Sequence, residues 1–382
     1  MITFIIVAAL VLLVIPDLYL WWVYVRESGS ALLGLLWWLP MAAGLSLWLA
    51  WSAGWYADWI IKSLFVILLS LALPKFIFMF FSLAGLCAGH WLPWLRHIVE
   101  LGGVVFSCAV SVCAVYGFVF GTNRLEVREV TVSSSRLPES FDGYRIVHIS
   151  DLHTGSFGSD TRFMKRLVEV VNGLGADAVL FTGDIVNASP DELIPYAGIL
   201  SGLEAADGVW SVAGNHDYCE YARYERVDGA MLAYARVMET EREMGWRVLS
   251  NEHRVLRRGG DEIVLAGVEN CGRPPFPSRG DLGRALEGSD EGLFTILMSH
   301  DPSQWRREVL GDSRVDLMLS GHTHGMQLEV CGWSPSSWSY SEWGGLYSEA
   351  GRMLYVSKGV GGTVPFRFGA WPEVTLLILR RL

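Results

Sequence analysis

The sequence predicts a bundle of four transmembrane helices at the N-terminus, followed by a globular α/β domain. Apolar residues dominate the chain up to Thr122, and ten of its 17 Trp lie before residue 95. The hydrophobic fraction of 51% is high for a single water-soluble domain. Strand-like apolar runs and a helical segment then follow, a pattern typical of α/β domains. We therefore predict residues 1–122 as the membrane region, 123–142 as a linker with the first strand, and 143–382 as the globular domain.

Four apolar stretches account for the predicted transmembrane helices. They are Ile2–Val25, Ala31–Trp55, Ile60–Ala88 and Ile98–Phe120. Each reaches the ~20 residues that a helix needs to cross ~30 Å of hydrocarbon. Trp residues cluster near the predicted ends, where an aromatic belt would contact both interfaces. The lipid bilayer is therefore a predicted partner, and we expect an integral, multi-pass protein of the cell membrane.

The first and third stretches each contain one charged residue. Asp17 follows Pro16, and Lys75 follows Pro74. At ~1.5 Å per residue the two would lie at similar depth, where a lone charge is costly. We expect the two side chains to pair. The alternative is that each extends to the interface or contacts water separately.

Basic residues favour one orientation of the predicted bundle. Lys62, Arg124 and Arg128 flank one side, against Arg26 and Arg96 on the other. This small excess predicts that the globular domain lies on the cytosolic side. The six Cys show no CxxC spacing and are expected to be reduced thiols, which agrees with that side. A net charge of −10 provides no basic surface, so no nucleic-acid partner is predicted.

The globular domain is predicted to begin with an alternating strand at 125–133. A helix is predicted at 161–174, where apolar residues recur at helical spacing. Apolar runs predict buried strands at 145–150, 178–182, 209–213, 263–268, 293–298 and 317–320. Ligands of open α/β sheets bind at the carboxyl ends of strands, so the segments that follow these strands are the candidate site.

Five such segments carry side chains that could hold metal ions. They are Asp151-Leu152-His153, Gly183-Asp184, Gly214-Asn215-His216-Asp217, Ser299-His300 and Gly321-His322-Thr323-His324-Gly325. Two cations held ~3.5–4 Å apart need a bridging carboxylate and several fixed ligands on each side. The sequence therefore predicts two divalent metal ions. Oxygen and nitrogen donors without a thiolate favour Mn²⁺, with Fe or Zn²⁺ as alternatives.

The order of these motifs resembles the calcineurin-like metallophosphoesterase superfamily, over about Gly143 to Arg380. The resemblance implies an α-β-β-α sandwich and a metal-dependent phosphoesterase. By motif, it implies that Asp151, His153, Asp184 and His324 hold one metal, and that Asp184, Asn215, His300 and His322 hold the other. A hydroxide bridging the metals would attack phosphorus in line. His216 would act as the acid, and Asp217 would orient it.

The second motif departs from the family pattern. The family usually reads GDxxDR there, whereas this chain reads Gly183-Asp-Ile-Val-Asn187-Ala188. The bridging Asp184 is present, but the Asp-Arg pair is missing. Any phosphate contact or ion pair made by that pair is therefore in doubt, while metal binding is not.

The loop Trp333–Tyr347 follows the last motif and carries three Trp and two Tyr. These rings could contact the interface or an acyl chain, or could pack on their own domain. The C-terminal run from Tyr355 to Leu376 resembles the membrane-associated branch of the superfamily, which includes transmembrane proteins with a metallophosphoesterase domain. Some bacterial members of that branch cleave the pyrophosphate of UDP-diacylglucosamine. Within it, Lys358 and Arg367 could meet a substrate phosphate, or could form surface or structural pairs.

Membrane tethering favours a lipid-linked substrate, because a site near the bilayer meets lipids at high local concentration. We therefore expect a phosphoesterase that hydrolyses a phosphodiester or pyrophosphate of a lipid or nucleotide-lipid. The second interpretation is a tethered general phosphatase or cyclic-nucleotide phosphodiesterase. The third is a catalytically inactive membrane scaffold, against which the intact ligand set argues. No oligomeric state is predicted.

Overall fold

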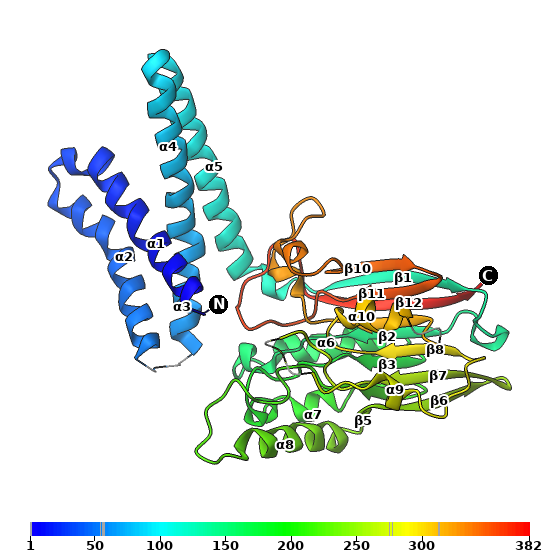
Figure 1. The fold of residues 1–382 in the computed structure, drawn as a ribbon. Helices are drawn as coiled ribbons and strands as arrows, with labels where there is room; N and C mark the ends of the chain where they lie inside the picture. The colour runs from blue at the N-terminus through cyan, green and yellow to red at the C-terminus, as the bar shows by residue number, and fades with distance from the viewer. Residues whose placement is uncertain (1, 54, 56–57, 275, 277, 312–313) are drawn as a thin grey trace. The chain divides into compact units, whose positions relative to one another are not determined.

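The computed structural model describes residues 2–53, 55, 58–274, 276, 278–311 and 314–382, and the side chains of residues 2–9 and 58 lie outside that description. The chain divides into two compact units (Figure 1). The membrane unit holds Met1–Gly121 together with Val364–Phe368. The α/β unit holds Thr122–Thr363 and Gly369–Leu382. A short C-terminal segment therefore clusters with the membrane unit, although the residues on both sides of it belong to the α/β unit.

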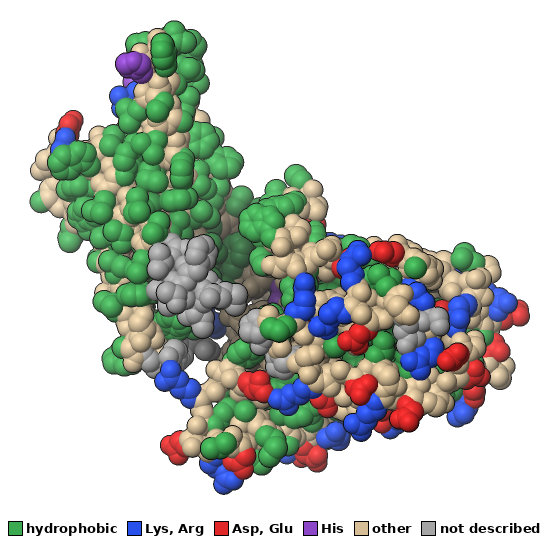
Figure 2. All heavy atoms as spheres, viewed as in Figure 1, with side chains coloured by type: hydrophobic (Ala, Val, Ile, Leu, Met, Phe, Trp, Pro, Cys, Tyr) green, Lys and Arg blue, Asp and Glu red, His purple; other side chains and the backbone are tan. Residues whose placement is uncertain are grey.

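Apolar helices build the membrane unit. They are α1 (Ile2–Leu20), α2 (Ala31–Ser52), α3 (Asp58–Ile67), α4 (Leu73–Trp91) and α5 (Pro93–Val119). A π-helical segment, η1 (Trp21–Val25), continues α1, and another, η3 (Leu68–Ala72), joins α3 to α4. The Ser30 hydroxyl accepts the Leu33 N–H at the start of α2, as an N-cap does. Figure 2 shows green hydrophobic side chains covering most of this unit, and charged ones spread over the α/β unit.

Three helical stretches among the described residues are long and apolar enough to cross a membrane. They are Ala31–Ser52, Trp59–Trp91 and Pro93–Val119. The structure thus shows three candidate spans where the sequence predicts four. The predicted first span, Ile2–Val25, corresponds to α1 and η1, but several of its side chains lie outside the described residues. A fourth span therefore stays a prediction.

The predicted pair of membrane charges forms. Lys75 Nζ lies 2.5 Å from Asp17 Oδ1. Trp37 contacts both partners, because its ring lies 4.4 Å from the ammonium nitrogen and its indole N–H donates to the Asp17 carbonyl at 3.2 Å. Pairing leaves no net charge in the hydrocarbon region, where either group alone would be strongly penalised.

Asp17→Asn and Lys75→Met should each destabilise the membrane unit, and the double variant should lose less than the sum. Either single change leaves one uncompensated charge, whereas the double variant leaves none. We expect a double-mutant cycle of unfolding in detergent to give a coupling free energy of about 1–3 kcal/mol. Additive losses would show that the two groups act independently.

Two six-stranded mixed sheets form the centre of the α/β unit (Figure 1). The strands are β1 (Glu126–Ser134), β2 (Arg145–Ile149), β3 (Ala178–Phe181), β4 (Val209–Ser211), β5 (Arg247–Val248), β6 (Glu252–Arg258), β7 (Asp261–Gly267), β8 (Phe294–Met298), β9 (Leu317–Ser320), β10 (Gly345–Glu349), β11 (Arg352–Val356) and β12 (Glu373–Arg381). The strand orders are β1-β12-β2-β3-β4-β5 and β10-β11-β9-β8-β7-β6. Strand β12 pairs parallel with β1 and antiparallel with β2, so the end of the chain joins the first strand to its sheet.

Three apolar clusters divide the α/β unit into four layers. Strands of both sheets direct alternate side chains into a shared inner core, for example Ile146, Leu180 and Ile296. The outer face of the first sheet packs under α6 (Arg162–Gly173), α7 (Ala197–Leu200) and α8 (Gly229–Glu243). The outer face of the second sheet packs under α9 (Leu282–Ala285) and α10 (Gln304–Arg307). The resulting order of layers is α-β-β-α.

The predicted strands and the predicted helix are present in the α/β unit. Their observed ends differ from the predicted ends by at most two residues. The apolar patterns did not predict β5, β6 and β10 to β12. Strands β6 and β10 lie at the edge of their sheet and expose charged or polar side chains. The position of β12 depends on pairing with strands more than 200 residues earlier in the chain, which local periodicity does not encode.

One buried carboxyl in this fold should make its stability depend on pH. Glu241 of α8 is fully buried and accepts the Ser211 hydroxyl at 2.5 Å. Burial, with a smaller contribution from the negative Asp217, raises the pKa of Glu241 from 4.5 to about 8. Between these two values the unfolded chain releases this proton while the folded chain keeps it. This group therefore favours folding at low pH, and its contribution is lost as pH rises through 8.

Glu241→Gln should flatten the pH dependence of stability, because the neutral amide replaces a carboxyl that must stay protonated. We expect the melting temperature of the full chain in detergent, compared with wild type, to be higher by several degrees at pH 8 and little changed at pH 5. Glu243→Gln is the matched control, since Glu243 lies exposed on the same helix beside Arg236. Equal pH profiles for wild type and Glu241→Gln would contradict the prediction.

Candidate metal centre

The five motifs lie at the carboxyl ends of strands from both sheets. Strands β2, β3 and β4 lead to Asp151, Asp184 and Asn215, and β8 and β9 lead to His300 and His322. Parallel neighbours end at the same edge of a sheet, so these loops converge. Six of the nine motif residues are buried, and the three partly exposed ones are His216, His322 and His324. The group of motif residues is therefore accessible to solvent on the side of these three imidazoles.

The backbone of the site is held in unusual conformations. Five motif residues other than glycine have φ between 46° and 73°: Asp151, His153, Asp184, His322 and His324. Such conformations cost about 1–3 kcal/mol each and persist at sites that the surrounding fold constrains. Gly214 and Gly321 allow the loops to approach closely, because a Cβ there would overlap the carboxylates of Asp184 and Asp151, respectively. The sharp turns point the side chains toward a common centre.

A first cluster consists of Asp151, His153 and His324, whose ligand atoms lie within 4.8 Å of one another. The Nε2 atoms of His153 and His324 are 3.2 Å apart. His324 Nε2 is 3.3 Å from Asp151 Oδ1. Two imidazole nitrogens and a carboxylate that converge in this way present three electron pairs to one point, as a divalent cation requires.

A second cluster consists of Asp184, His300 and His322, again within 4.8 Å. His300 Nε2 lies 3.1 Å from Asp184 Oδ2 and 3.2 Å from His322 Nδ1. Asp184 Oδ2 also lies 3.6 Å from His153 Nε2 of the first cluster. One carboxylate thus adjoins both clusters, which is the position of a bridging ligand.

Asn215 fits the second cluster by its chemistry. Its amide N–H donates to the Tyr221 hydroxyl at 2.9 Å, while its carbonyl oxygen Oδ1 is buried without a hydrogen-bond partner. A buried acceptor without a partner is costly, and a cation would satisfy it. Tyr221 was not predicted from sequence. Only its place four residues after the Gly214–Asp217 motif could have indicated it.

Contacts on the far side of each ring fix which nitrogen faces the site. His153 Nδ1 contacts Asn187 Oδ1 at 2.8 Å, and His300 Nδ1 contacts the Thr182 carbonyl at 2.7 Å. Each contact leaves Nε2 directed at the clusters, as metal-ligating histidines require. His322 instead directs Nδ1 inward, because the Tyr340 hydroxyl lies 2.8 Å from its Nε2. The sequence analysis did not predict the Tyr340 contact either, although Tyr340 lies in the aromatic loop, Trp333–Tyr347.

Burial holds two imidazoles of the site, those of His153 and His322, in the neutral form, whereas the neighbouring Asp184 holds the His300 imidazole protonated. Burial, with repulsion from His216, lowers the pKa of His153 to about 3. Burial also lowers the pKa of His322 to about 4. Both imidazoles are therefore neutral, and neutral imidazole is the form that binds metals. Burial opposes charge on Asp184 and His300, but their mutual attraction holds the pKa of Asp184 well below its usual value and raises that of His300 to about 10.

His216 lies beside the two clusters and is held by the backbone. Its N–H donates to Asp184 Oδ1 at 2.8 Å, and its ring Nδ1 contacts the Asn187 carbonyl oxygen at 2.6 Å. The ring packs against Tyr221, with centroids 4.5 Å apart. His216 also lies within 4.8 Å of ligand atoms of His153 and Asp184. These contacts leave Nε2 as the free ring nitrogen at the edge of the site.

The expected role of Asp217 differs from the observed contacts. The resemblance implied that it orients His216, but the carboxylate accepts backbone N–H groups of Asp184, Ile185 and Gly214 at 2.8 Å each. Asp217 therefore joins the loop after β3 to the loop after β4. The carbonyl of Asn187 takes the orienting position instead, because the Asp217 side chain is directed into the buried turn.

Asn187 occupies the position where the family motif has its second Asp. Its side chain contacts His153, its carbonyl contacts His216, and its amide nitrogen Nδ2 donates to Ser156 Oγ at 3.0 Å. The Glu192 carboxylate accepts the Asn187 N–H and so fixes this loop. The missing Asp is thus replaced by a neutral residue that positions two imidazoles of the site.

Asn187→Ala should weaken metal binding by about 10–100-fold, because the His153 ring would lose the contact that fixes its orientation. Titration of the metal-depleted full chain with Mn²⁺ would measure the change. Asn187→Asp is the matched variant, since it keeps an oxygen acceptor for His153 and restores the family residue; we expect it to bind metal at least as well as wild type. An unchanged affinity of Asn187→Ala for Mn²⁺ would show that Asn187 does not orient the His153 ring for metal binding.

The two basic residues predicted near a substrate phosphate are both buried. Lys358 Nζ forms an ion pair with Glu329, and its ammonium lies 5.9 Å from the centre of the Trp343 ring. This contact favours the structural-pairing alternative for Lys358. Arg367 belongs to the segment that clusters with the membrane unit, where its N–H donates to the Gly117 carbonyl at 3.2 Å. A contact between Arg367 and a substrate phosphate stays a prediction.

The aromatic loop after the last motif is anchored at its base and exposed at its tip. Ser334 Oγ donates to the Gly325 carbonyl at 2.6 Å, which ties the loop to the metal-ligand segment. Trp333 and Trp338 pack edge to face and expose 45% and 78% of their surface. An indole this exposed is typical of a surface that meets a bilayer or an apolar ligand. The other three aromatic residues of the loop, Tyr340, Trp343 and Tyr347, are half-buried and contact the domain, as the alternative expects. The two alternatives therefore apply to different residues of the loop.

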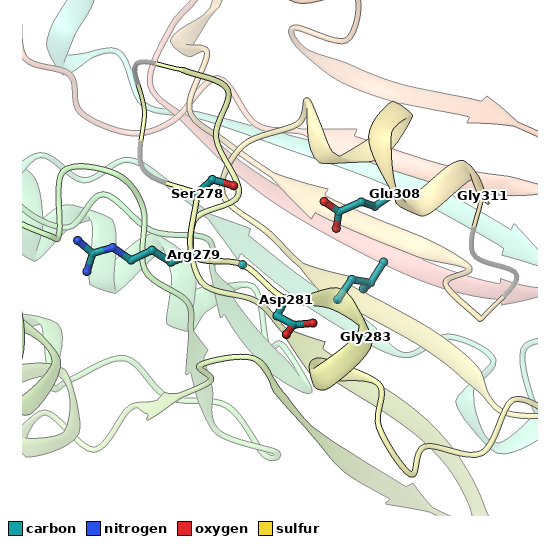
Figure 3. A pocket seen from close by; sticks show the side chains of 8 residues that line it. Ser278, Arg279, Asp281, Gly283, Glu308 and Gly311 are labelled. Atoms are coloured by element: carbon teal, nitrogen blue, oxygen red, sulfur yellow. The ribbon is translucent and has the colours of Figure 1, made fainter.

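A cavity of about 810 Å³ lies apart from the clusters. Ser278, Arg279, Asp281 and Glu308 are among its lining residues, and none of the predicted site residues lines it (Figure 3). Figure 3 shows the Arg279 side chain directed away from Asp281 and Glu308. Its guanidinium pairs with Glu220 at 2.5 Å. This cavity therefore contains none of the candidate metal ligands.

Comparison with known proteins agrees with this geometry. The family model described as calcineurin-like phosphoesterase matches residues 144–326. The chain is 30% identical over 292 residues to the uncharacterized metallophosphoesterase YkuE of Bacillus subtilis, with 73% of this chain and 94% of that protein covered. It is 30% identical over 282 residues to the transmembrane protein with metallophosphoesterase domain of Danio rerio, covering 71% of this chain and 61% of that protein.

A third relative carries a substrate in its name. The UDP-2,3-diacylglucosamine pyrophosphatase LpxG of Chlamydia trachomatis is 26% identical over 311 residues, with 67% of this chain and 91% of that protein covered. The family match, the relatives and the two ligand clusters agree on the kind of enzyme. This chain belongs to the calcineurin-like metallophosphoesterase family and is a metal-dependent phosphoesterase.

Proposed function

We propose that this chain is a membrane-bound phosphoesterase that uses two divalent metal ions to hydrolyse a phosphodiester or pyrophosphate of a lipid or nucleotide-lipid. The observation that carries the proposal is the pair of ligand clusters joined by Asp184. Clusters built from oxygen and nitrogen donors, with no thiolate among them, favour Mn²⁺. The small excess of basic residues beside the spans favours a catalytic domain on the cytosolic side.

The residues divide into two ligand sets and one proton donor. Asp151, His153, Asp184 and His324 would hold one ion, and Asp184, Asn215, His300 and His322 the other. When bound, the ions would supply an activated water and neutralise charge on the phosphoryl oxygens. His216 would donate a proton from Nε2 to the leaving oxygen, because Nδ1 is engaged by the Asn187 carbonyl.

Three features support a lipid-linked substrate. The chain carries apolar helices that can span a membrane, so the catalytic unit stays close to the bilayer. The exposed pair Trp333 and Trp338 lies on a loop tied to the ligand segment at Gly325. A relative covered over 91% of its length is named for hydrolysis of a nucleotide-lipid pyrophosphate. Hydrolysis of a soluble phosphoester would need neither the apolar helices nor the exposed Trp pair.

The test compares substrates on one preparation. Purified full chain in detergent with Mn²⁺ would receive UDP-diacylglucosamine, bis(p-nitrophenyl) phosphate and a cyclic nucleotide. Asp184→Asn would report whether turnover depends on the metal centre. Asp160→Asn is the matched control, because Asp160 lies at the surface beside Arg162 and outside both clusters.

Each outcome separates one interpretation from the others. Cleavage of the lipid nucleotide that is lost in Asp184→Asn would support the full proposal. Cleavage of the soluble diester or cyclic nucleotide alone would support the metal centre but contradict the lipid substrate. Metal bound in full with no turnover on any ester would instead favour the inactive scaffold.

A further inference from the structure

The membrane unit contains a cavity of about 340 Å³ that the proposed phosphoesterase reaction does not use. It lies among η1, α2, η3, α4 and α5, and its walls are mostly apolar, with Leu71, Phe78 and Val104 among them. This volume falls within the range of pockets that bind small ligands. Every lining residue belongs to the membrane unit, so the cavity is a property of that unit alone.

Two hydroxyl groups in this cavity have no hydrogen-bond partner among the described residues. Ser70 Oγ and Ser107 Oγ are buried, and their residues expose only 4% and 8% of their surface. A third serine, Ser111, also lines the cavity and donates to the Ser70 carbonyl. Buried polar groups are nearly always satisfied, and water is scarce inside a bilayer. The two free hydroxyls therefore indicate a ligand that supplies a hydrogen-bonding oxygen.

The two π-helical segments found among the described residues of the membrane unit both line this cavity. Tyr24 and Val25 belong to η1, and Ser70 and Leu71 belong to η3. A π-helical turn widens the helix and carries an inserted residue, and such turns are frequent at functional sites. Within η3, the Ser70 carbonyl accepts a hydrogen bond from the Ser111 hydroxyl. Two such turns at one cavity are a second, independent sign of a binding site.

The charges around the cavity favour a neutral ligand. Lys75 lines the wall, but its ammonium is paired with Asp17 at 2.5 Å and lies against the Trp37 ring. The pair has no net charge, so an anionic ligand would have to displace Asp17. A hydroxyl, ester or amide oxygen needs only the two serine hydroxyls.

The lining residues extend along α5 from Val104 to Ser111, about 10 Å at ~1.5 Å per residue, which is long enough for part of a hydrocarbon chain. The polar end of the cavity is marked by Tyr24, whose hydroxyl donates to Glu100 Oε1 at 2.8 Å. Glu100 also pairs with Arg96 on the same helix, as charged groups near an interface do. Ser107 lies seven residues further along α5 than Glu100, which is about 10 Å at ~1.5 Å per residue. A chain that enters at the polar end would thus pass the serines on its way inward.

We propose that this cavity binds one hydrocarbon chain of a neutral lipid, whose hydroxyl or carbonyl oxygen hydrogen-bonds with Ser70 and Ser107. The site is separate from the metal centre and does not depend on the proposed substrate. The apolar walls would hold the methylene groups, and the serines would select chains that carry an oxygen over plain hydrocarbon. The paired Lys75 would give no advantage to a carboxylate.

Photo-crosslinking with three chain-matched probes would test this inference. The full chain in detergent would be irradiated with a diazirine-bearing monoacylglycerol, with the corresponding fatty acid, or with the corresponding alkane. Labelled peptides would be located by mass spectrometry. We expect saturable labelling of η3, α4 and α5 by the monoacylglycerol, at least about fivefold above the alkane, which is the scale of one hydrogen bond.

Serine variants give the second measurement. The double variant Ser70→Ala with Ser107→Ala should lower monoacylglycerol labelling to the level of the alkane. Ser46→Ala is the matched control, because Ser46 lies on α2 outside the cavity and its hydroxyl donates to its own helix at Ala42. It should leave labelling unchanged.

Equal labelling by the alkane and the monoacylglycerol would overturn the proposal, because the cavity would then hold hydrocarbon without selection. Strongest labelling by the fatty acid would also overturn it and would assign the site to an anion at Lys75. If the double variant failed to fold, the comparison of the three probes on wild type would still decide between these results.

Discussion

Asp184→Asn is expected to release both metal ions and to abolish hydrolysis. Asp184 Oδ2 lies 3.1 Å from His300 Nε2 and 3.6 Å from His153 Nε2, so one carboxylate serves both clusters. An amide has no negative charge and only one oxygen to offer, so it would not bridge two cations. Removing a residue that only orients a ligand typically weakens metal affinity by ~10–100-fold. The loss of the bridge should exceed that range for both sites at once.

Metal content and turnover should be measured on the same preparation. We expect wild type to bind two ions per chain and Asp184→Asn fewer than one, with turnover on bis(p-nitrophenyl) phosphate near background. The N–H of His216 donates to Asp184 Oδ1, and an amide oxygen could still accept it, so the loop should keep its fold. Circular dichroism would verify this, and Asp160→Asn should behave as wild type. Two retained ions with normal turnover would show that Asp184 is not the bridge.

Local sequence pattern predicts the parts of this fold that depend on short-range order. Strand β3 is apolar on both faces, with Val179 and Phe181 directed to the helices and Leu180 to the inner core. Such a run followed by Gly183-Asp184 predicts both the strand and a ligand at its end. The candidate metal ligands of the five motifs can therefore be recognised in the sequence, and the structure brings their side chains together.

Features that depend on long-range contacts are not visible in the same way. Asp217 follows His216 directly, yet its carboxylate accepts N–H groups from the loop after β3 rather than contacting the ring. The role of Asn187 requires knowing that the loops after β2, β3 and β4 meet. Arg367 lies 43 residues after His324 in sequence, and only the clustering of the fold assigns it to the membrane unit.

His216→Ala is expected to keep both metals while turnover falls by about 10²–10⁴-fold, the usual contribution of a general acid or base. The Asn187 carbonyl and the Tyr221 ring fix the imidazole, so its Nε2 can donate a proton to a leaving oxygen. The competing possibility is that His216 is itself a ligand, because it lies within 4.8 Å of ligand atoms of His153 and Asp184. Metal content separates the two roles.

The leaving group provides a sharper test of the same role. A p-nitrophenolate departs without a proton, whereas an alkoxide needs one, so His216→Ala should slow an alkyl ester far more than a p-nitrophenyl ester. His253→Ala is the matched control, because this ring contacts the Ala285 carbonyl outside both clusters. Loss of metal from His216→Ala would make the residue a ligand. An equal loss of turnover on both esters, with the metals retained, would instead assign it to stabilising phosphoryl charge rather than to proton transfer.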